Sequence, residues 1–238
     1  MEQIESFSKA IYNSLIKNDY WVYLKNGLVT TVIVTLFALL IGFFLGLFIS
    51  IIRTAHKDLD LSAKTPAGFF LKLANSLVSL FVTFIRGTPT TIQLLIMFNI
   101  FLVGLDNLKL VAILTFGLNS SAYMSEIFRG GIQTVSKGER EAARSLGMGY
   151  VQSLRLIVLP QAFRSCLPAL GNEVITLFKE TSISGFIGLI DLTRGSTIIV
   201  SQTFTATVPY FAAALIYLLV VMVLEFLFRR LEKRFDHA

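Results

Sequence analysis

Long apolar stretches along this chain are separated by short charged segments. Residues 28–52 contain no charged side chain, and a helix of this length reaches about 37 Å at about 1.5 Å per residue. A bilayer core about 30 Å thick needs roughly 20 apolar residues in a helix. This stretch therefore predicts a transmembrane helix that crosses with some tilt.

Residues 73–105 form a second apolar stretch, whose one charged residue is Arg86. A straight helix of this length would reach about 50 Å, which is too long for a single crossing. The sequence offers a break at Gly87-Thr88-Pro89, because proline removes a helix hydrogen-bond donor. Two helices joined by a tight turn and one crossing with a broken middle both fit this length.

Three further apolar stretches follow, at 108–128, 165–190 and 208–228. The first becomes polar in its second half, and the second is interrupted by Glu173 and by Lys179-Glu180. Only 15% of the chain is charged and its mean hydropathy is +0.71, whereas soluble domains carry about 25% charged residues. The pattern predicts an all-α membrane protein with one transmembrane domain over residues 1–238.

The basic residues predict the orientation, because they collect on the cytoplasmic side of membrane proteins. With the N-terminus outside and five crossings, fourteen basic residues lie inside and five lie outside. The inside set is Arg53, Lys57, Lys64, Lys72, Arg129, Lys137, Arg140, Arg144, Arg155, Arg164, Arg229, Arg230, Lys233 and Arg234; the outside set is Lys9, Lys17, Lys25, Lys109 and Arg194. Six crossings would put either 53–72 or the C-terminus on the wrong side. We therefore predict about five spans, with 73–105 as one broken crossing and the C-terminus cytoplasmic.

This asymmetry also accounts for the net charge of +6, which would suggest a nucleic-acid partner in a soluble protein. We expect no nucleic acid as partner. The single cysteine, Cys166, and the separated His56 and His237 form no ligand-spaced cluster, so no metal site is expected. No catalytic residue is predicted.

Residues 129–164 form the longest predicted inside loop. Strong helix formers predict a short helix over 139–146, with Ala142, Ala143 and Leu146 on one face and Gly147 as its stop. A second short helix is predicted over 151–159, ended by Pro160. A small helix near the membrane suits insertion into a groove on a partner, and a connector lying on the membrane surface fits equally well.

This loop resembles the EAA loop of ATP-binding-cassette (ABC) importer permeases. The matching residues are Glu141-Ala142-Ala143, then Gly147 after three residues, then Ile157, Val158 and Leu159-Pro160. Similarity to the polar amino-acid branch (importers of the His, Glu, Gln, Arg and cystine type) extends from about residue 23 to about 228. It includes Phe84-Ile85-Arg86-Gly87-Thr88-Pro89, Asn119-Ser120-Ser121-Ala122-Tyr123, Glu126-Ile127-Phe128-Arg129-Gly130-Gly131-Ile132, Pro160-Gln161-Ala162-Phe163-Arg164, Pro168-Ala169-Leu170-Gly171-Asn172-Glu173 and Lys179-Glu180-Thr181-Ser182.

The resemblance implies a type I ABC importer permease fold in a bacterial cytoplasmic (inner) membrane. It also implies a second permease subunit, identical or homologous, a dimer of ATPase subunits and an extracytoplasmic substrate-binding protein. The coupling loop would be 137–160, and the residues that couple to the ATPase would be Glu141, Ala142, Ala143, Gly147, Leu159 and Pro160. The chain itself would hold no cofactor, because ATP-Mg would bind to the ATPase.

The sequence has no P-loop, which agrees with the binding of ATP by a separate ATPase subunit. Lys64-Thr65 is the only lysine followed by serine or threonine, and it lacks both glycines of the motif, since Ala63 precedes it and position 58 is Asp.

Charged residues within the spans are the candidates for a substrate site, because they are costly there and face a cavity or a partner. A free amino acid needs a cationic donor and an anionic acceptor, and arginine suits a carboxylate. We expect Arg86 to bind the carboxylate, with amide donors from Gly87-Thr88, and Glu126 or Glu173 to bind the ammonium. The candidate set is Arg86, Thr88, Gln93, Tyr123, Glu126, Glu173, Lys179 and Glu180. The alternative is that these charges pair with one another.

Two other function classes stay open from the residues alone. An ion channel or secondary transporter would use the intramembrane charges for ion coupling, but it leaves the EAA spacing unexplained. A membrane-embedded enzyme would need a nucleophile and base or metal ligands in the spans. The sequence does not reveal which amino acid is carried, whether the two permeases are identical, or whether this subunit itself holds a substrate site.

Overall fold

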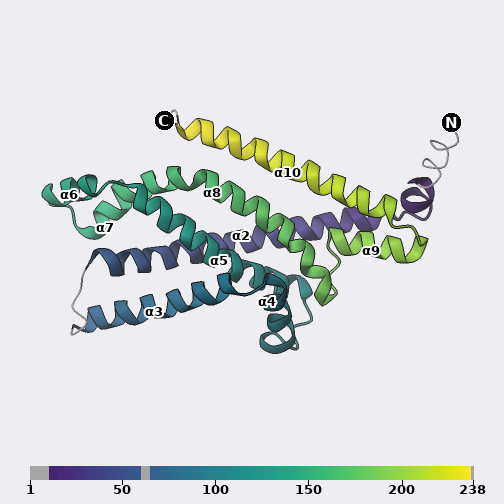
Figure 1. Ribbon diagram of the computed structural model, residues 1–238, viewed down its shortest axis with the longest axis horizontal. Helices are drawn as coiled ribbons and strands as arrows, with labels where there is room; N and C mark the ends of the chain where they lie inside the picture. The colour runs from purple at the N-terminus through teal and green to yellow at the C-terminus, as the bar shows by residue number, and fades with distance from the viewer. Residues whose placement is uncertain (1–10, 60–64, 237–238) are drawn as a thin grey trace. The chain divides into compact units, whose positions relative to one another are not determined.

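The computed structural model describes residues 11–59 and 65–236, and all regular elements within them are helical (Figure 1). In chain order they are η1 (Tyr12–Ile16), α2 (Trp21–Asp58), α3 (Pro66–Gly87), α4 (Thr90–Ile96), η2 (Met97–Phe101), α5 (Leu108–Thr134), α6 (Lys137–Ser145), α7 (Tyr150–Ser153), η3 (Leu154–Val158), α8 (Leu159–Glu180), η4 (Thr181–Ile187), α9 (Leu192–Thr203) and α10 (Thr207–Asp236). The all-α class predicted from the sequence is confirmed.

Each apolar stretch of the sequence falls mainly in helices. Residues 28–52 lie in α2, 108–128 in α5 and 208–228 in α10, whereas 165–190 is mostly α8 and η4. The stretch 73–105 is divided, because α3 ends at Gly87 and α4 begins at Thr90. Thr88, in an extended conformation, separates them next to Pro89, as the missing proline donor leads one to expect.

Three of the described helices are long and apolar enough to cross a membrane, namely α2, α3 and α10. A fourth crossing is possible by length and composition if the bent pair Tyr150–Ile187 and Leu192–Thr203 is one span. The helix α5 does not meet this test, although the sequence predicts a span there. Its polar residues Asn119, Ser120, Ser121 and Ser125 are buried within the protein, so they lower its hydropathy without facing lipid.

The helix predicted to end at Pro160 does not end there, and this prediction is wrong. The chain stays helical from Tyr150 through Pro160 to Ile187. The π-helical turn η3 lies directly before α8, of which Pro160 is the second residue. The backbone hydrogen bonds change here from the π-helical to the α-helical pattern. The N–H group that proline lacks therefore breaks no continuous series of α-helical hydrogen bonds.

The chain divides into two compact units, and each is described by itself. The first comprises the described part of Met1–Ala38, with Thr90–Phe116 and Ile175–Leu224. Its core is formed by Leu24, Leu192, Ile199 and Ala213. Asp191 caps α9 by accepting hydrogen bonds from the backbone N–H groups of Thr193 and Arg194.

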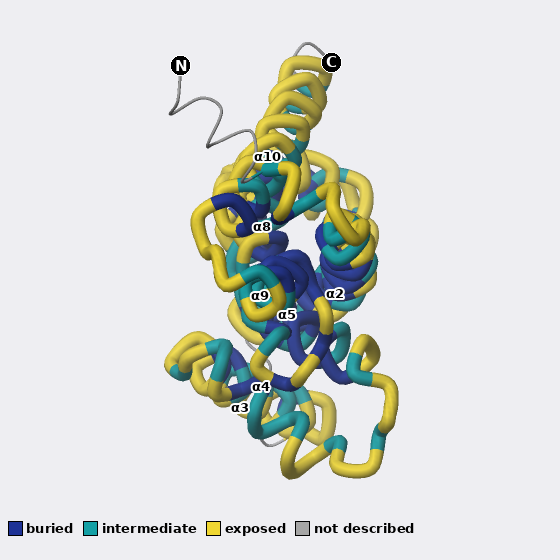
Figure 2. Tube along the Cα trace, turned by 90° about the vertical axis from the view of Figure 1, so that its right-hand side faces the viewer, coloured by how far each residue is buried: buried dark blue, intermediate teal, exposed yellow. Residues whose placement is uncertain are grey.

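The second unit comprises Leu39–Pro89, Gly117–Val174 and the described part of Glu225–Ala238. Within it, α2 packs closely on α5 at two glycines four residues apart. A Cβ atom on Gly42 would lie 2.9 Å from Ser120 Cβ, and one on Gly46 would lie 2.7 Å from Met124 Cβ. Small residues at this spacing let helix backbones approach in membranes. Figure 2 shows α5 buried along much of its length, whereas α10 is largely exposed.

We predict that Gly46→Ala destabilises the protein by about 1–3 kcal/mol, because the added methyl group meets Met124 and the Ser121 carbonyl. The thermal unfolding midpoint of the purified protein in detergent would fall. The matched control is Gly130→Ala in α5, where no atom lies within 4 Å of the new Cβ. Equal midpoints for the two variants would contradict the close contact.

Candidate translocation and coupling sites

A cluster of arginines surrounds Glu126 in the second unit. Arg53 of α2 and Arg129 of α5 form ion pairs with this carboxylate, and Arg86 Nη1 of α3 lies 3.9 Å from Glu126 Oε1. Three guanidinium groups share one carboxylate, so the cluster carries an excess of positive charge. The arrangement joins side chains from three helices, α2, α3 and α5.

A cavity of about 430 Å³ opens beside this cluster. It is lined by Arg53, Val82, Thr83, Arg86, Gly87, Tyr123 and Glu126. The Arg86 side chain is 45% exposed, and its guanidinium carbon lies 5.5 Å from the centre of the Tyr123 ring. A carboxylate suits this cavity chemically, because a guanidinium group binds carboxylates with two parallel hydrogen bonds.

Three of the predicted site residues therefore meet at one cavity, namely Arg86, Tyr123 and Glu126. Both oxygens of Glu126 are engaged by arginines, which corresponds to the alternative in which the intramembrane charges pair with one another. Sequence reasoning missed Arg53, which it counted among the charges flanking the first span. Its position directly after the charge-free stretch 28–52 gave no signal of a contact with Glu126.

The other candidates have separate surroundings. Thr88 donates its hydroxyl to the Phe84 carbonyl at 2.9 Å, and Glu173 accepts a hydrogen bond from the buried Ser120 hydroxyl at 2.7 Å. Gln93, Lys179 and Glu180 belong to the first unit, where Gln93 is buried on α4. The structure thus divides the predicted substrate residues among several places in the fold.

The predicted coupling helix is α6, which begins and ends with well-defined caps. The Ser136 hydroxyl accepts a hydrogen bond from the Glu139 N–H at 3.2 Å. At the other end, Gly147 N–H bonds to the Arg144 carbonyl and Met148 N–H to the Ala143 carbonyl, which is a Schellman motif. Gly147 has φ +79°, a left-handed conformation that glycine adopts without strain.

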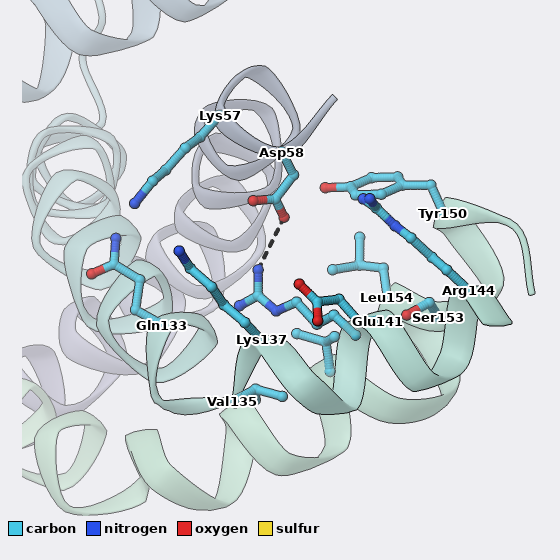
Figure 3. Close-up of a pocket in the computed structure, with 12 residues that line it drawn as sticks. Lys57, Asp58, Gln133, Val135, Lys137, Glu141, Arg144, Tyr150, Ser153 and Leu154 are labelled. Carbon is cyan, nitrogen blue, oxygen red and sulfur yellow. Dashed lines mark hydrogen bonds and ion pairs between the residues drawn. The ribbon is translucent and has the colours of Figure 1, made fainter. Parts of the chain in front are cut away.

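Side-chain contacts hold α6 on the ends of the longer helices of the same unit. Arg140 Nη1 donates to Asp58 Oδ2 of α2 at 3.1 Å (dashed line in Figure 3). Its Nη2 donates to the Ile132 carbonyl of α5. Gln161 of α8 donates to the Glu139 carboxylate. These contacts connect α6 to α2, α5 and α8.

The exposed face of α6 is narrower than the sequence suggested. Glu141, Ala142 and Leu146 are exposed, Leu146 by 82%, whereas Ala143 is buried at 1% exposure. Ala143 therefore packs inside the loop and leaves the outer face to its neighbours. A single exposed leucine is common on protein surfaces and does not by itself indicate an interface.

Comparison with known proteins identifies the family of this chain. Residues 65–237 match the family described as the binding-protein-dependent transport system inner membrane component. The chain belongs to this family. The permease is 37% identical over 216 residues to the L-cystine transport system permease protein TcyL of Bacillus subtilis (strain 168), covering 87% of the permease and 84% of TcyL. It is 36% identical over 176 residues to the glutamine transport system permease protein GlnP of Escherichia coli (strain K12), covering 72% and 79% of the two chains.

Solved structures agree with this assignment. A crystal structure of an amino acid ABC transporter with histidines aligns with a TM-score of 0.78 at 36% identity, covering 90% of the permease and 95% of that chain. An inward-facing form of the MetNI methionine ABC transporter aligns with a TM-score of 0.75 at 21% identity and supports the fold alone. The type I importer permease fold and the family resemblance predicted from the EAA loop are confirmed.

We predict that the Arg140–Asp58 pair contributes about 1 kcal/mol of coupling energy, because both side chains are only about one-fifth exposed, at 22% and 21%. A double-mutant cycle with Arg140→Ala and Asp58→Ala measures it by unfolding of the permease in mixed micelles. The matched control is the Arg229–Glu225 pair, which is 76% and 48% exposed and should couple much more weakly. Equal coupling in the two cycles would show that Arg140 does not anchor α6.

Proposed function

We propose that the permease is the membrane subunit of an ABC importer that moves polar amino acids into the bacterial cytoplasm. Its relatives TcyL and GlnP are named as L-cystine and glutamine permeases, which supports this substrate class. The observation that carries the proposal is the cavity at Arg86, where cationic groups outnumber the single carboxylate of Glu126. Such a cavity suits the carboxylate that every free amino acid carries.

The proposal assigns energy supply to other chains. Two ATPase subunits on the cytoplasmic side would bind ATP-Mg, and each would receive the α6 helix of one permease in a surface groove. A second permease, identical or homologous, completes the pathway, and an extracytoplasmic binding protein delivers the amino acid. This arrangement requires the N-terminus outside and the loop 137–160 inside, which the fourteen-to-five distribution of basic residues supports.

In this mechanism α6 is the segment of the permease that the ATPases move. Closure of the ATPases pushes on α6, and the contacts of Arg140 and Glu139 pass the displacement to α2, α5 and α8. Because α2 and α5 also carry Arg53 and Glu126, the same displacement reaches the cationic cavity. Family membership and the fixed position of α6 favour this function over an ion channel or a secondary transporter.

We predict that Gly147→Arg abolishes ATP-driven uptake while the permease still folds. An arginine at φ +79° strains the end of α6 and adds a bulky cation beside the exposed Leu146. Gly147→Asn is the control, because asparagine tolerates the left-handed conformation and is small. Uptake and ATP hydrolysis are measured in proteoliposomes that contain the assembled transporter. Normal uptake by a folded Gly147→Arg transporter would count against α6 as the coupling helix.

We also predict that Arg86→Gln raises the KM for uptake by about tenfold or more, because a hydrogen bond to a charged group contributes about 1.5–3 kcal/mol. Arg86→Lys should have an intermediate effect, since lysine keeps the charge but loses the paired hydrogen bonds. Labelled cystine, glutamine and arginine are the probes, and Arg164→Gln, at an exposed position of α8 outside the loop 137–160, is the control. An unchanged KM for all three amino acids in Arg86→Gln would exclude Arg86 from the substrate site.

A further inference from the structure

A second polar cavity, of about 420 Å³, lies beneath α6 (Figure 3). It is lined by residues from the end of α2, the end of α5, α6, α7 and η3, all of the second unit. The lining residues are Lys57, Asp58, Gln133, Val135, Lys137, Arg140, Glu141, Arg144, Tyr150, Ser153, Leu154 and Val158. Four are basic and two are acidic, so positive charge is in excess.

The excess charge is not neutralised within the described residues. Asp58 is paired with Arg140, whereas Lys57, Lys137 and Arg144 form no ion pair there. Lys57, Lys137 and Gln133 all line this cavity, and Figure 3 draws the three side chains in the same half of the view. Two ammonium groups and an amide in the lining of one cavity provide several hydrogen-bond donors for a polyatomic anion.

Tyr150 adds a further donor to the lining. Within the described part of the chain its buried hydroxyl has no hydrogen-bond partner. Burial and the nearby Asp58 raise the pKa of Tyr150 to about 12, so the hydroxyl stays protonated at neutral pH. The cavity therefore offers donors and cations at several points of its wall.

The position of the cavity along α2 indicates where such an anion would come from. The charge-free stretch ends at residue 52, and Lys57 lies five residues further along the helix, which is about 8 Å. The headgroup layer of a bilayer adds roughly 5–8 Å to each side of the apolar core. Lys57 is thus expected at the level of the lipid phosphates, where basic pockets of membrane proteins bind anionic headgroups.

We propose that this cavity binds a phosphate group, supplied by an anionic phospholipid of the cytoplasmic leaflet, through Lys57 and Lys137. The proposal rests on the cytoplasmic position of α6 given under the proposed function. A bound phosphate would bridge α2 and α6 beside the Arg140–Asp58 pair and strengthen the connection that transmits movement. Inorganic phosphate has the same chemistry, so the test separates the two sources.

The test is native mass spectrometry of the assembled transporter in detergent, titrated with phosphatidylglycerol or with phosphatidylcholine. Lys57→Gln/Lys137→Gln removes the proposed ligands, and Arg164→Gln/Lys233→Gln is the control with the same change of net charge at exposed positions outside the cavity. We expect wild type and control to retain phosphatidylglycerol at least about fivefold better than the cavity variant, and phosphatidylcholine to show no such difference. A parallel titration with inorganic phosphate is followed by calorimetry.

Each outcome decides the proposal. Phosphatidylglycerol binding that is lost only in the cavity variant supports a lipid site, and loss of inorganic phosphate binding alone supports a phosphate site with a soluble source. Equal binding of both ligands by the cavity variant and wild type overturns the site. Loss of ATPase association in the cavity variant with unchanged lipid binding also overturns it, because the cavity would then receive the protein partner. Since binding needs no transport, failure here is distinct from failure of the uptake experiments.

Discussion

The anchoring of α6 is the interaction on which the rest of this account depends. A nine-residue helix has little stability alone, because helices of fewer than about 12–15 residues are marginal in water. Here it is capped by Ser136 and Gly147 and fixed through Arg140 to the ends of α2 and α5. A helix held in this way transmits force, whereas a flexible connector would absorb it.

The cluster at Glu126 follows from the cost of charge in a membrane. An isolated arginine in a span is unfavourable by several kcal/mol, and a carboxylate shared by several arginines lowers that cost. Glu126 compensates the charge of Arg86 only in part, because the Arg86 guanidinium lies 3.9 Å away and its side chain remains 45% exposed. A guanidinium group that is partly compensated and open to a cavity is the feature on which the proposed binding of a substrate carboxylate rests. The same helices, α2 and α5, carry both this cluster and the contacts to α6.

Much of this structure could be predicted from sequence because it depends on local properties. Apolar length located the helices, Pro89 located the break after α3, and the helix formers of 139–146 followed by Gly147 located α6 and its end. The cluster around Glu126 could not be predicted, because it joins residues that are distant in the sequence. Arg53 was therefore read as a flanking charge rather than as a partner of Glu126.

Other differences between prediction and structure have equally physical causes. Pro160 was expected to end a helix, but the π turn before it accommodates the missing donor. Ala143 was expected on the same face as Ala142 and Leu146, but it is buried within the protein whereas those two residues are exposed. Residues 108–128 were predicted to span the membrane, but α5 does not meet the test of length and apolar composition, because its buried serines and Asn119 lower its hydropathy. Tertiary packing decides each of these cases.

The central claim is that α6 lies on the cytoplasmic side, where a motor protein can act on it. The direct measurement is labelling with a membrane-impermeant maleimide of Ser145→Cys, on exposed α6, in a Cys166→Ser permease expressed without its ATPase. Ser201→Cys, on α9 in the predicted outside segment, is the matched control. The account predicts that Ser145→Cys is labelled in inverted vesicles and Ser201→Cys in intact spheroplasts. Labelling of Ser145→Cys in intact spheroplasts would contradict it.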